Sequence, residues 1–258
     1  MSDAELRRTR AGRPVWHYRA VGSTNDTAAE LARMQGEMDR SPCWVIADHQ
    51  TAGRGRRGRA WSDHADNFSG TLLWPLAPEH GRTPALFSFL AALAIVDSFE
   101  AVGIPRTIIG LKWPNDVLLE GGKVCGILVE TVAGLEGLMA ATIGIGVNLA
   151  QVPPHAPPEG RALSQWITPP PPTAFLETLD ARFDEWWAIY GAHGFSRIRS
   201  AWLERATGLN QALVVRLSDR TLEGIFRGLD KDGALLLEHQ GEVTRFLAGD
   251  VFLRRQTA

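Results

Sequence analysis

The sequence predicts an α+β protein in which a large domain of strands and helices is followed by a small β-module. The 258 residues are 45% hydrophobic and 22% charged, so the chain can bury a sizeable core. Eight of the fifteen prolines fall in residues 151–172, which is typical of a connector without regular structure. Beyond residue 208, short apolar segments alternate with Asp and Gly turns, as in small β-barrels. We therefore expect domains at 1–207 and 208–258.

Local patterns place the elements of both domains. Ser23, Thr24 and Asn25 are good N-cap residues, and Thr83-Pro84 is a helix start. The helices are expected over residues 27–34, 84–99, 173–190 and 195–206, with the aromatic residues of the third in the core. Strands are expected over residues 44–48, 68–74, 108–112, 117–119, 124–131, 138–149, 212–217, 222–229, 234–238 and 243–247. The first ten residues are expected to form a polar arm.

Composition excludes several classes of function. The formal net charge of -2 and the isoelectric point near 6.4 argue against a broad basic face for DNA or membranes. Cys43 and Cys125 are too few for a disulfide framework or a cysteine-rich metal site, and no metal ligands are assigned. No export signal is visible, and the longest apolar stretch, 85–96, is too short for a membrane span. We expect a cytoplasmic protein with no DNA partner and no membrane partner.

The first motif is the run Gly53-Arg54-Gly55-Arg56-Arg57-Gly58-Arg59, closed by Ala60-Trp61. It combines four guanidinium groups with three glycines in a chain of nearly balanced charge. Arginine matches phosphate or carboxylate, and glycine lets backbone N–H groups approach a ligand. Because the run lies between two predicted strands, we interpret it as a loop that binds one anionic group, in preference to a solvated loop or an RNA-binding tail.

The second motif is Lys112-Trp113-Pro114-Asn115-Asp116. A lysine at the end of a strand, before a proline turn, is held in a fixed direction and can serve as a positioned charge. The alternative is an exposed lysine beside a turn, with Asn115 and Asp116 as turn formers. Gly144 and Gly146 lie inside a predicted strand, which indicates a close approach by a ligand or by backbone.

Together these motifs resemble the biotin protein ligase family in order and spacing. The resemblance covers residues 15–149, and the β-module from residue 209, with Ala248-Gly249-Asp250-Val251 at its end, looks like the family's SH3-like C-terminal domain. The matching runs are Ser23-Thr24-Asn25, Gln50-Thr51-Ala52-Gly53 with the arginine run to Trp61, Lys112-Trp113-Pro114-Asn115-Asp116, Gly126-Ile127-Leu128-Val129-Glu130 and Gly144-Ile145-Gly146-Val147-Asn148-Leu149.

The resemblance implies a fold and an activity. The fold would be a mixed β-sheet flanked by helices, as in lipoate ligases and class II synthetases, with an SH3-like β-barrel after it. The activity would be ATP-dependent and AMP-forming: biotin is activated to biotinyl-5'-AMP and transferred to a lysine of a biotin carboxyl carrier protein, as in acetyl-CoA carboxylase. ATP and Mg²⁺ would be required, and the assembly could be a monomer or a homodimer. No enzymic nucleophile is needed.

The resemblance also implies roles for individual residues. Arg56 and Lys112 would contact the biotin carboxylate and the α-phosphate and are the expected catalytic residues. The biotin pocket would be formed by Ser23, Thr24, Asn25, Gln50, Gly53, Arg54, Gly55, Arg56 and Lys112. The adenylate would be held by Arg56, Arg59, Trp61, Lys112 and Asn148. Structural roles stay open for Ser23 to Asn25 as helix caps, for Trp61 in the core and for Asn148 at a strand end.

Two departures from the family pattern bear on these expectations. The segment His64-Ala65-Asp66-Asn67-Phe68-Ser69 lacks the glycine and the apolar-aromatic pair that the family often carries, which affects the pocket wall. Only some twenty residues precede Ser23, so we expect the monofunctional type without an N-terminal DNA-binding domain. A lipoate or octanoyl ligase of the same fold and a biotin-responsive repressor are the alternatives, with an RNA-binding protein as a third.

Overall fold

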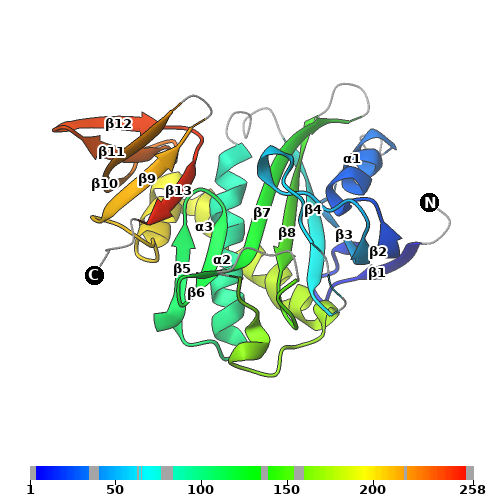
Figure 1. Ribbon diagram of the computed structural model, residues 1–258. Coiled ribbons are helices and arrows are strands. Elements are labelled where there is room, and N and C mark those ends of the chain that lie inside the picture. The colour runs from blue at the N-terminus through cyan, green and yellow to red at the C-terminus, as the bar shows by residue number, and fades with distance from the viewer. Residues whose placement is uncertain are drawn as a thin grey trace.

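The computed structural model describes residues 4–34, 41–62, 64, 66–76, 84–134, 139–153, 160–217 and 220–253. Thr83, Ala65, Leu138 and residues 154–159 of the predicted connector lie outside the described residues. The chain forms an eight-stranded mixed sheet with three helices and a separate five-stranded antiparallel sheet (Figure 1). The predicted fold class is confirmed.

The large sheet has the strand order β1-β2-β3-β4-β8-β7-β6-β5. Its strands are β1 (Ala4–Arg8), β2 (Pro14–Val21), β3 (Cys43–Gln50), β4 (Phe68–Leu76), β5 (Ile109–Lys112), β6 (Asp116–Leu119), β7 (Gly122–Ala133) and β8 (Met139–Val147). Only β2 and β3 are parallel among these pairs of described strands. Parallel neighbours need a crossover, and α1 (Thr24–Met34) lies in the segment that joins them.

The two faces of the sheet pack against different helices, as the alternation of strand residues requires. In β3, Val45 belongs to the small cluster that packs with Leu31 of α1. Its neighbours Trp44 and Ile46 belong to the large core, together with α2 (Pro84–Ala101) and α3 (Pro172–Leu203). Helix α2 is apolar on all sides because it lies between the sheet and α3. The face that carries α1 is therefore the one on which a ligand site can open.

Helix α3 is interrupted at one residue. Gly194 has φ 67°, a left-handed conformation that glycine adopts without the steric cost of a side chain. The interruption falls between the two predicted helices, 173–190 and 195–206, and confirms that division. The expected core role of the aromatic residues is also confirmed, because Phe175 and Phe183 are fully buried and the Trp187 ring packs 4.6 Å from the Trp74 ring centre.

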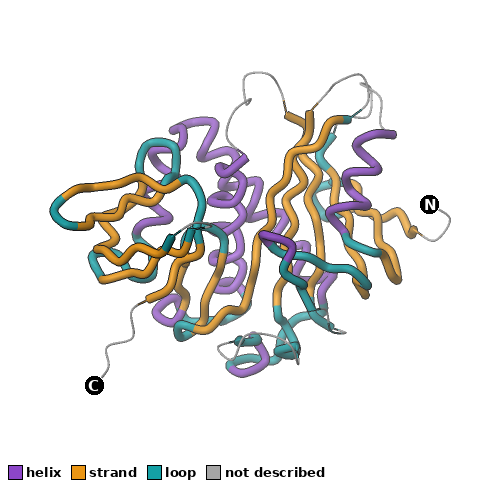
Figure 2. Tube along the Cα trace, turned by 45° about the horizontal axis from the view of Figure 1, so that its top comes forward, coloured by secondary structure: helices purple, strands orange, loops and turns teal. Residues whose placement is uncertain are grey.

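The C-terminal sheet has the order β12-β11-β10-β9-β13. Its strands are β9 (Ala212–Arg216), β10 (Thr221–Leu229), β11 (Leu235–His239), β12 (Glu242–Phe246) and β13 (Asp250–Leu253). It lies at the end of the molecule opposite to β1 (Figures 1 and 2). Its apolar side joins the large core, and Trp113 Nε1 donates a hydrogen bond to the Gly233 carbonyl at 3.0 Å. The exact division at residue 207 stays a prediction.

Three strands, β1, β2 and β13, differ from the sequence expectations. No strand was predicted over Pro14–Val21, which forms β2, because its two buried residues, Val15 and Tyr18, are three positions apart and give no alternating pattern. Residues 4–8 form the edge strand β1 instead of a polar arm, paired with β2. An edge strand exposed on both faces needs no apolar alternation, and four of these five residues are exposed. Strand β13 was not predicted, because four residues after a turn are too few to show a period; it pairs with β9 from Asp250 to Leu253.

Candidate functional site

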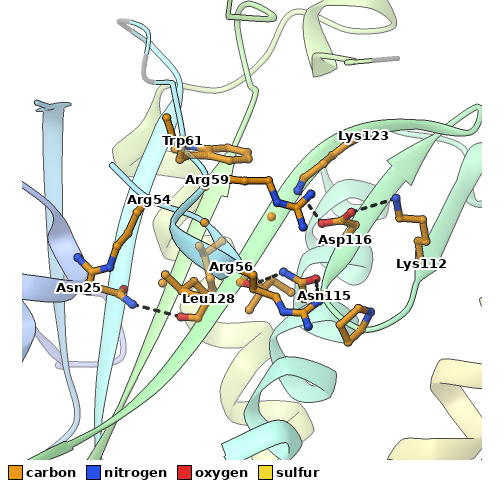
Figure 3. Close-up of a pocket in the computed structure, with 18 of the residues that line it drawn as sticks. Asn25, Arg54, Arg56, Arg59, Trp61, Lys112, Asn115, Asp116, Lys123 and Leu128 are labelled. Carbon is orange, nitrogen blue, oxygen red and sulfur yellow. Dashed lines mark hydrogen bonds and ion pairs between the residues drawn. The ribbon is translucent and has the colours of Figure 1, made fainter. Parts of the chain in front are cut away.

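A cavity of about 200 Å³ opens on the α1 face of the large sheet. Its wall comes from the start of α1, the loop after β3, the β5–β6 turn, β7, β8 and strand β13 of the second sheet. Figure 3 shows Asn25 and Arg54 at one end of this space and Lys112 and Lys123 at the other. Two sheets and segments from across the sequence thus build one site.

Residues 53–61, which we call the arginine loop, fold back on themselves beside the cavity. Arg54 and Ala60 form an antiparallel bridge, and the Gly55 amide donates to the Arg59 carbonyl at 2.7 Å. Residues Arg56–Gly58 make one turn of 3₁₀-helix between them. A Cβ at Gly53 would lie 2.7 Å from the Trp61 carbonyl oxygen, so glycine is required there for the loop to close.

One end of the cavity is a network of neutral hydrogen-bonding groups, which we call the amide end. The Thr24 amide donates to Gln50 Oε1 at 2.9 Å, and the hydroxyls of Thr24 and Thr71 lie 2.8 Å apart. Thr71 Oγ1 also lies 2.7 Å from Asn25 Oδ1. Asn25 is only 4% exposed, and its amide nitrogen donates to Glu130 Oε2 at 2.8 Å. These buried groups hold one another in place before any ligand enters.

Arg54 lies beside the amide end, but carboxylates already pair with its charge. Its guanidinium contacts Asp26 and lies 3.0 Å from Glu130 Oε2. The hydrogen bond that Arg54 donates to Asp26 raises the pKa of Arg54 above its usual range, so the group stays charged. One guanidinium against two carboxylates leaves a formal charge of -1 beside the amide end, so Arg54 is not free to attract an anion there.

The floor of the cavity depends on two glycines of β8. A Cβ at Gly144 would lie 2.2 Å from Asn25 Oδ1, and one at Gly146 would lie 2.4 Å from Trp61 Cε2. Both face the cavity, whereas the intervening Ile145 belongs to the large core. A close approach is present at both glycines, but the expected partner was a ligand or backbone, and here side chains make the approach: Asn25 lies over Gly144 and the Trp61 ring over Gly146.

The other end gathers positive charge around one carboxylate, and we call it the cationic end. Lys123 Nζ lies 2.6 Å from Asp116 Oδ1, and Lys112 Nζ lies 3.3 Å from Asp116 Oδ2 (Figure 3). Lys123 Nζ also lies 5.5 Å from the centre of the Trp61 ring, within range of a cation–π interaction. Lys112 and Asp116 are opposite each other in the β5–β6 pair, and Asp116 pairs with Gly126 in β7, which fixes this arrangement.

Arg56 joins the same end from the arginine loop. Its Nη1 lies 3.4 Å from Asn115 Oδ1 and 3.2 Å from the Gly249 carbonyl. Burial lowers the pKa of Arg56, and the charge of Asp250 acts in the opposite direction. At this end the lining holds four cationic side chains, Arg56, Arg59, Lys112 and Lys123, against two carboxylates, Asp116 and Asp250. A small anion would therefore be attracted to this end.

Ten of the residues proposed from sequence line the cavity together. They are Ser23, Thr24, Asn25, Gln50, Arg54, Gly55, Arg56, Arg59, Trp61 and Lys112. Gly53 does not line it; its backbone instead packs against Trp61 at the closure of the arginine loop. Asn148 does not line it either: its side chain donates to the Arg161 carbonyl at 2.9 Å, as a strand-end residue would.

Sequence reasoning missed Lys123, Asp250 and Phe252, and it gave Asp116 no role beyond the turn. A lysine after two glycines looks like an ordinary hairpin residue, and only the pairing of β6 with β7 shows that it meets Asp116. The structure describes no group of three or more His, Cys, Asp or Glu side chains that could hold a metal ion. None of the described helices is long and apolar enough to cross a membrane.

Known proteins share both parts of the chain. Residues 16–148 match the biotin/lipoate A/B protein ligase family, and residues 208–254 match the biotin protein ligase C terminal domain. A biotin–[acetyl-CoA-carboxylase] ligase of Paracoccus denitrificans is 40% identical over 90% of this chain and 98% of its own length. The Mycobacterium tuberculosis enzyme of the same name is 31% identical over 90% of this chain and 85% of its own length.

Solved structures share the fold. A biotin protein ligase from Aquifex aeolicus in complex with biotin and ATP superimposes with a TM-score of 0.77, at 22% identity, over 93% of this chain and 98% of that chain. At this identity the likeness shows the fold, while the family rests on the matched sequence and the two curated relatives. On these grounds the chain belongs to the biotin protein ligase family.

Proposed function

We propose that this protein is an ATP-dependent biotin–[acetyl-CoA-carboxylase] ligase, which forms biotinyl-5'-AMP and transfers biotin to a lysine of a carboxyl carrier protein. The observation that carries the assignment is the division of one cavity into an amide end and a cationic end. Biotin has the same division, with a neutral ureido ring at one end and a carboxylate at the other. Membership of the family and the names of its relatives support the same activity.

The amide end fits the ureido ring. Ser23, Thr24 and Gln50 line the cavity with hydroxyl and amide groups, which can serve the ring's N–H donors and its carbonyl acceptor. Asn25 lies in the same wall, but Glu130 and Thr71 already bind its amide, so it shapes the pocket as well as lining it. A lipoyl group would place an apolar dithiolane ring against these buried polar groups, which disfavours the lipoate alternative.

The cationic end fits the reacting groups. In the first step a carboxylate oxygen of biotin attacks the α-phosphorus of ATP, and the bond to pyrophosphate breaks. Arg56 and Lys112, with Lys123 added by the geometry, would stabilise the charge that develops on the phosphoryl oxygens. In the second step a lysine amine of the carrier attacks the acyl carbon, loses a proton and displaces AMP. Neither step needs an enzymic nucleophile.

Trp61 offers its ring to the adenine. Its indole packs on the Gly146 backbone, and Lys123 Nζ lies over the ring at 5.5 Å from its centre, so both contacts hold the ring in position. Asn148 is turned away into the protein, so any role toward the nucleotide would be indirect.

The cationic end offers Mg²⁺ a carboxylate ligand, and the remaining ligands would have to come from the substrate phosphates and water. Mg²⁺ is commonly bound by one or two carboxylates together with substrate phosphates, and Asp116 is a carboxylate that lines the cavity. Such an ion would neutralise charge on the departing pyrophosphate. Lys112 and Lys123, which contact Asp116 here, would then be free to turn toward the phosphates.

The experiment combines the protein with ATP, Mg²⁺, biotin and a biotin carboxyl carrier domain. We expect pyrophosphate release that requires biotin, followed by a mass increase of one biotinyl group on the carrier. Lipoate in place of biotin serves as the control and is expected to give neither product. Pyrophosphate release that is independent of biotin, or that responds equally to lipoate, would refute the assignment.

A further inference from the structure

The arginine loop contacts the second sheet at one point of strand β13. Arg59 Nη2 lies 2.6 Å from both carboxylate oxygens of Asp250, and Arg57 Nη1 lies 3.5 Å from Asp250 Oδ2. The carbonyl of the preceding Gly249 accepts a hydrogen bond from Arg56. Two successive residues of the C-terminal sheet thus hold three arginines of the loop.

Asp250 is well placed to act as an anchor. Its backbone is fixed opposite Arg216 in the β9–β13 pair, and its side chain is only 21% exposed. The loop is the softer partner, because Arg57 and Arg59 are exposed and the loop contains three glycines. Asp250 is already ordered by the strand pairing, whereas the loop has more conformational entropy to lose. When the two pair, the carboxylate therefore fixes the position of the guanidinium and not the reverse.

The contact leaves the arginines able to bind a second anion. Asp250 engages Arg59 through Nη2 alone, and Asn115 and Gly249 engage Arg56 through Nη1 alone. Each guanidinium has five N–H donors in a fork, so Nη1 of Arg59 and Nη2 of Arg56 keep donors for another acceptor. An anchor that uses one edge of the fork is compatible with a ligand on the other.

We propose that Asp250 is a positioning residue that holds the arginine loop over the cavity, so that the C-terminal sheet controls how long the adenylate is retained. This inference rests on the proposed function, since it concerns the phosphate end of biotinyl-5'-AMP. The proposal predicts the sign of the change in adenylate affinity when Asp250 is removed. If Asp250 instead competed with the ligand for the arginines, its removal would tighten adenylate binding, whereas loss of an anchor weakens it.

The first test uses the ligand-free protein and trypsin, which cleaves after arginine. In Asp250→Asn the side chain keeps its shape but loses its charge, and Asp250→Glu keeps the charge. The matched control is Asp232→Asn, which removes an ion pair with Arg245 in the same sheet, away from the cavity.

We expect cleavage within residues 54–59 to be about three- to tenfold faster in Asp250→Asn, in keeping with the modest strength of exposed ion pairs. Asp250→Glu and Asp232→Asn should cleave at the wild-type rate. Equal rates in Asp250→Asn and the wild type would overturn the proposal.

The second test measures dissociation of pre-formed biotinyl-5'-AMP and of biotin from the same variants. Asp250→Asn is expected to release the adenylate several-fold faster and biotin at an unchanged rate, with an unchanged unfolding temperature. Slower release of the adenylate would show a competitor, and equal acceleration for both ligands would show a general structural role; either result overturns the proposal. Failure of the wild-type protein to make the adenylate from biotin and ATP would refute the proposed function instead, and the trypsin result does not depend on it.

Discussion

The two ends of the cavity are built on different physical principles. The amide end is a buried network in which Asn25, Thr71 and Glu130 satisfy one another through hydrogen bonds of 2.7 and 2.8 Å. The charges of the cationic end come from the arginine loop, two hairpins and the second sheet. The first end is rigid because every buried polar group must keep its partner. The second end is held by charge pairs of two kinds: a ligand anion could take the place of Asp116 beside the lysines, whereas the proposed anchor Asp250 would stay paired with Arg59.

The comparison also separates what each end does for the reaction. If the amide end is the pocket for the ureido ring, as proposed, its preformed network would give affinity and selectivity for biotin with little ordering cost on binding. At the cationic end, Asp116 and Asp250 take positions near cations that the phosphates would later approach. Damage to the amide end should therefore appear in biotin binding, and damage to the cationic end in adenylate formation and retention.

The largest expected effect is at Lys123. Lys123→Ala removes an ammonium that contacts both Asp116 and the Trp61 ring. We expect the rate of biotin-dependent pyrophosphate release to fall by about 10²-fold, as for other positioned charges in electrostatic catalysis. Lys112 contacts the other carboxylate oxygen of Asp116, so Lys112→Ala is the matched variant and should also lose most of its activity. Substitution of either lysine by arginine should restore little of the rate, because a guanidinium does not reproduce a compact ammonium charge. Biotin affinity measured by calorimetry should change little, and a near-normal rate in Lys123→Ala would return it to the role of an ordinary hairpin lysine.

These residues show how far the sequence alone could lead. The arginine loop and Lys112 were predicted because glycine-arginine repeats and a strand-end lysine before proline are local signals. The glycines of β8 were also recognised as points of close approach, although their partners, Asn25 and Trp61, depend on the tertiary fold.

Lys123 and Asp250 carried no local signal. Their importance depends on strand register in one case and on packing between two sheets in the other. Edge strand β1 escaped notice for a related reason, because exposure on both faces removes the alternation on which strand prediction depends.

A smaller effect is expected at the amide end from Gly144→Ala. The new Cβ would lie 2.2 Å from Asn25 Oδ1, and Asn25 cannot move without breaking its bonds to Thr71 and Glu130. The net contribution of one hydrogen bond is about 0.5–1.5 kcal/mol, so disturbing it corresponds to roughly 2- to 12-fold in affinity. Calorimetry should show this loss for biotin. An unchanged biotin affinity would mean that the network is not the ureido pocket.

Gly146→Ala, two residues along the same strand, is the matched test of the cationic end. Its Cβ would meet the Trp61 ring at 2.4 Å, but the ring belongs to an exposed loop and can shift. We expect the KM for ATP to rise by about fivefold, since base–aromatic stacking contributes on the order of 1 kcal/mol or more, and biotin affinity to remain close to that of the wild type. If the two glycine variants affected the same ligand, the division of the cavity into two ends would be wrong.

The smallest effect should come from salt. The Debye length falls from about 10 Å at 0.1 M salt to about 3 Å at 1 M, so exposed charges are screened while buried neutral hydrogen bonds are not. In the proposed binding mode biotin contacts both ends with its neutral ring at the amide end, whereas the phosphate of biotinyl-5'-AMP would lie among Arg56, Arg59 and the lysines. Between 0.1 and 0.5 M NaCl we therefore expect adenylate dissociation to accelerate by about two- to threefold and biotin dissociation to change by much less. The dissociation rates of biotin and of the adenylate are then measured in Asp250→Asn. Part of the salt effect on the wild type comes from the Arg59–Asp250 pair, so adenylate dissociation from this variant should depend less steeply on salt. Equal salt responses for biotin and the adenylate would show that charge is not what distinguishes the two ends.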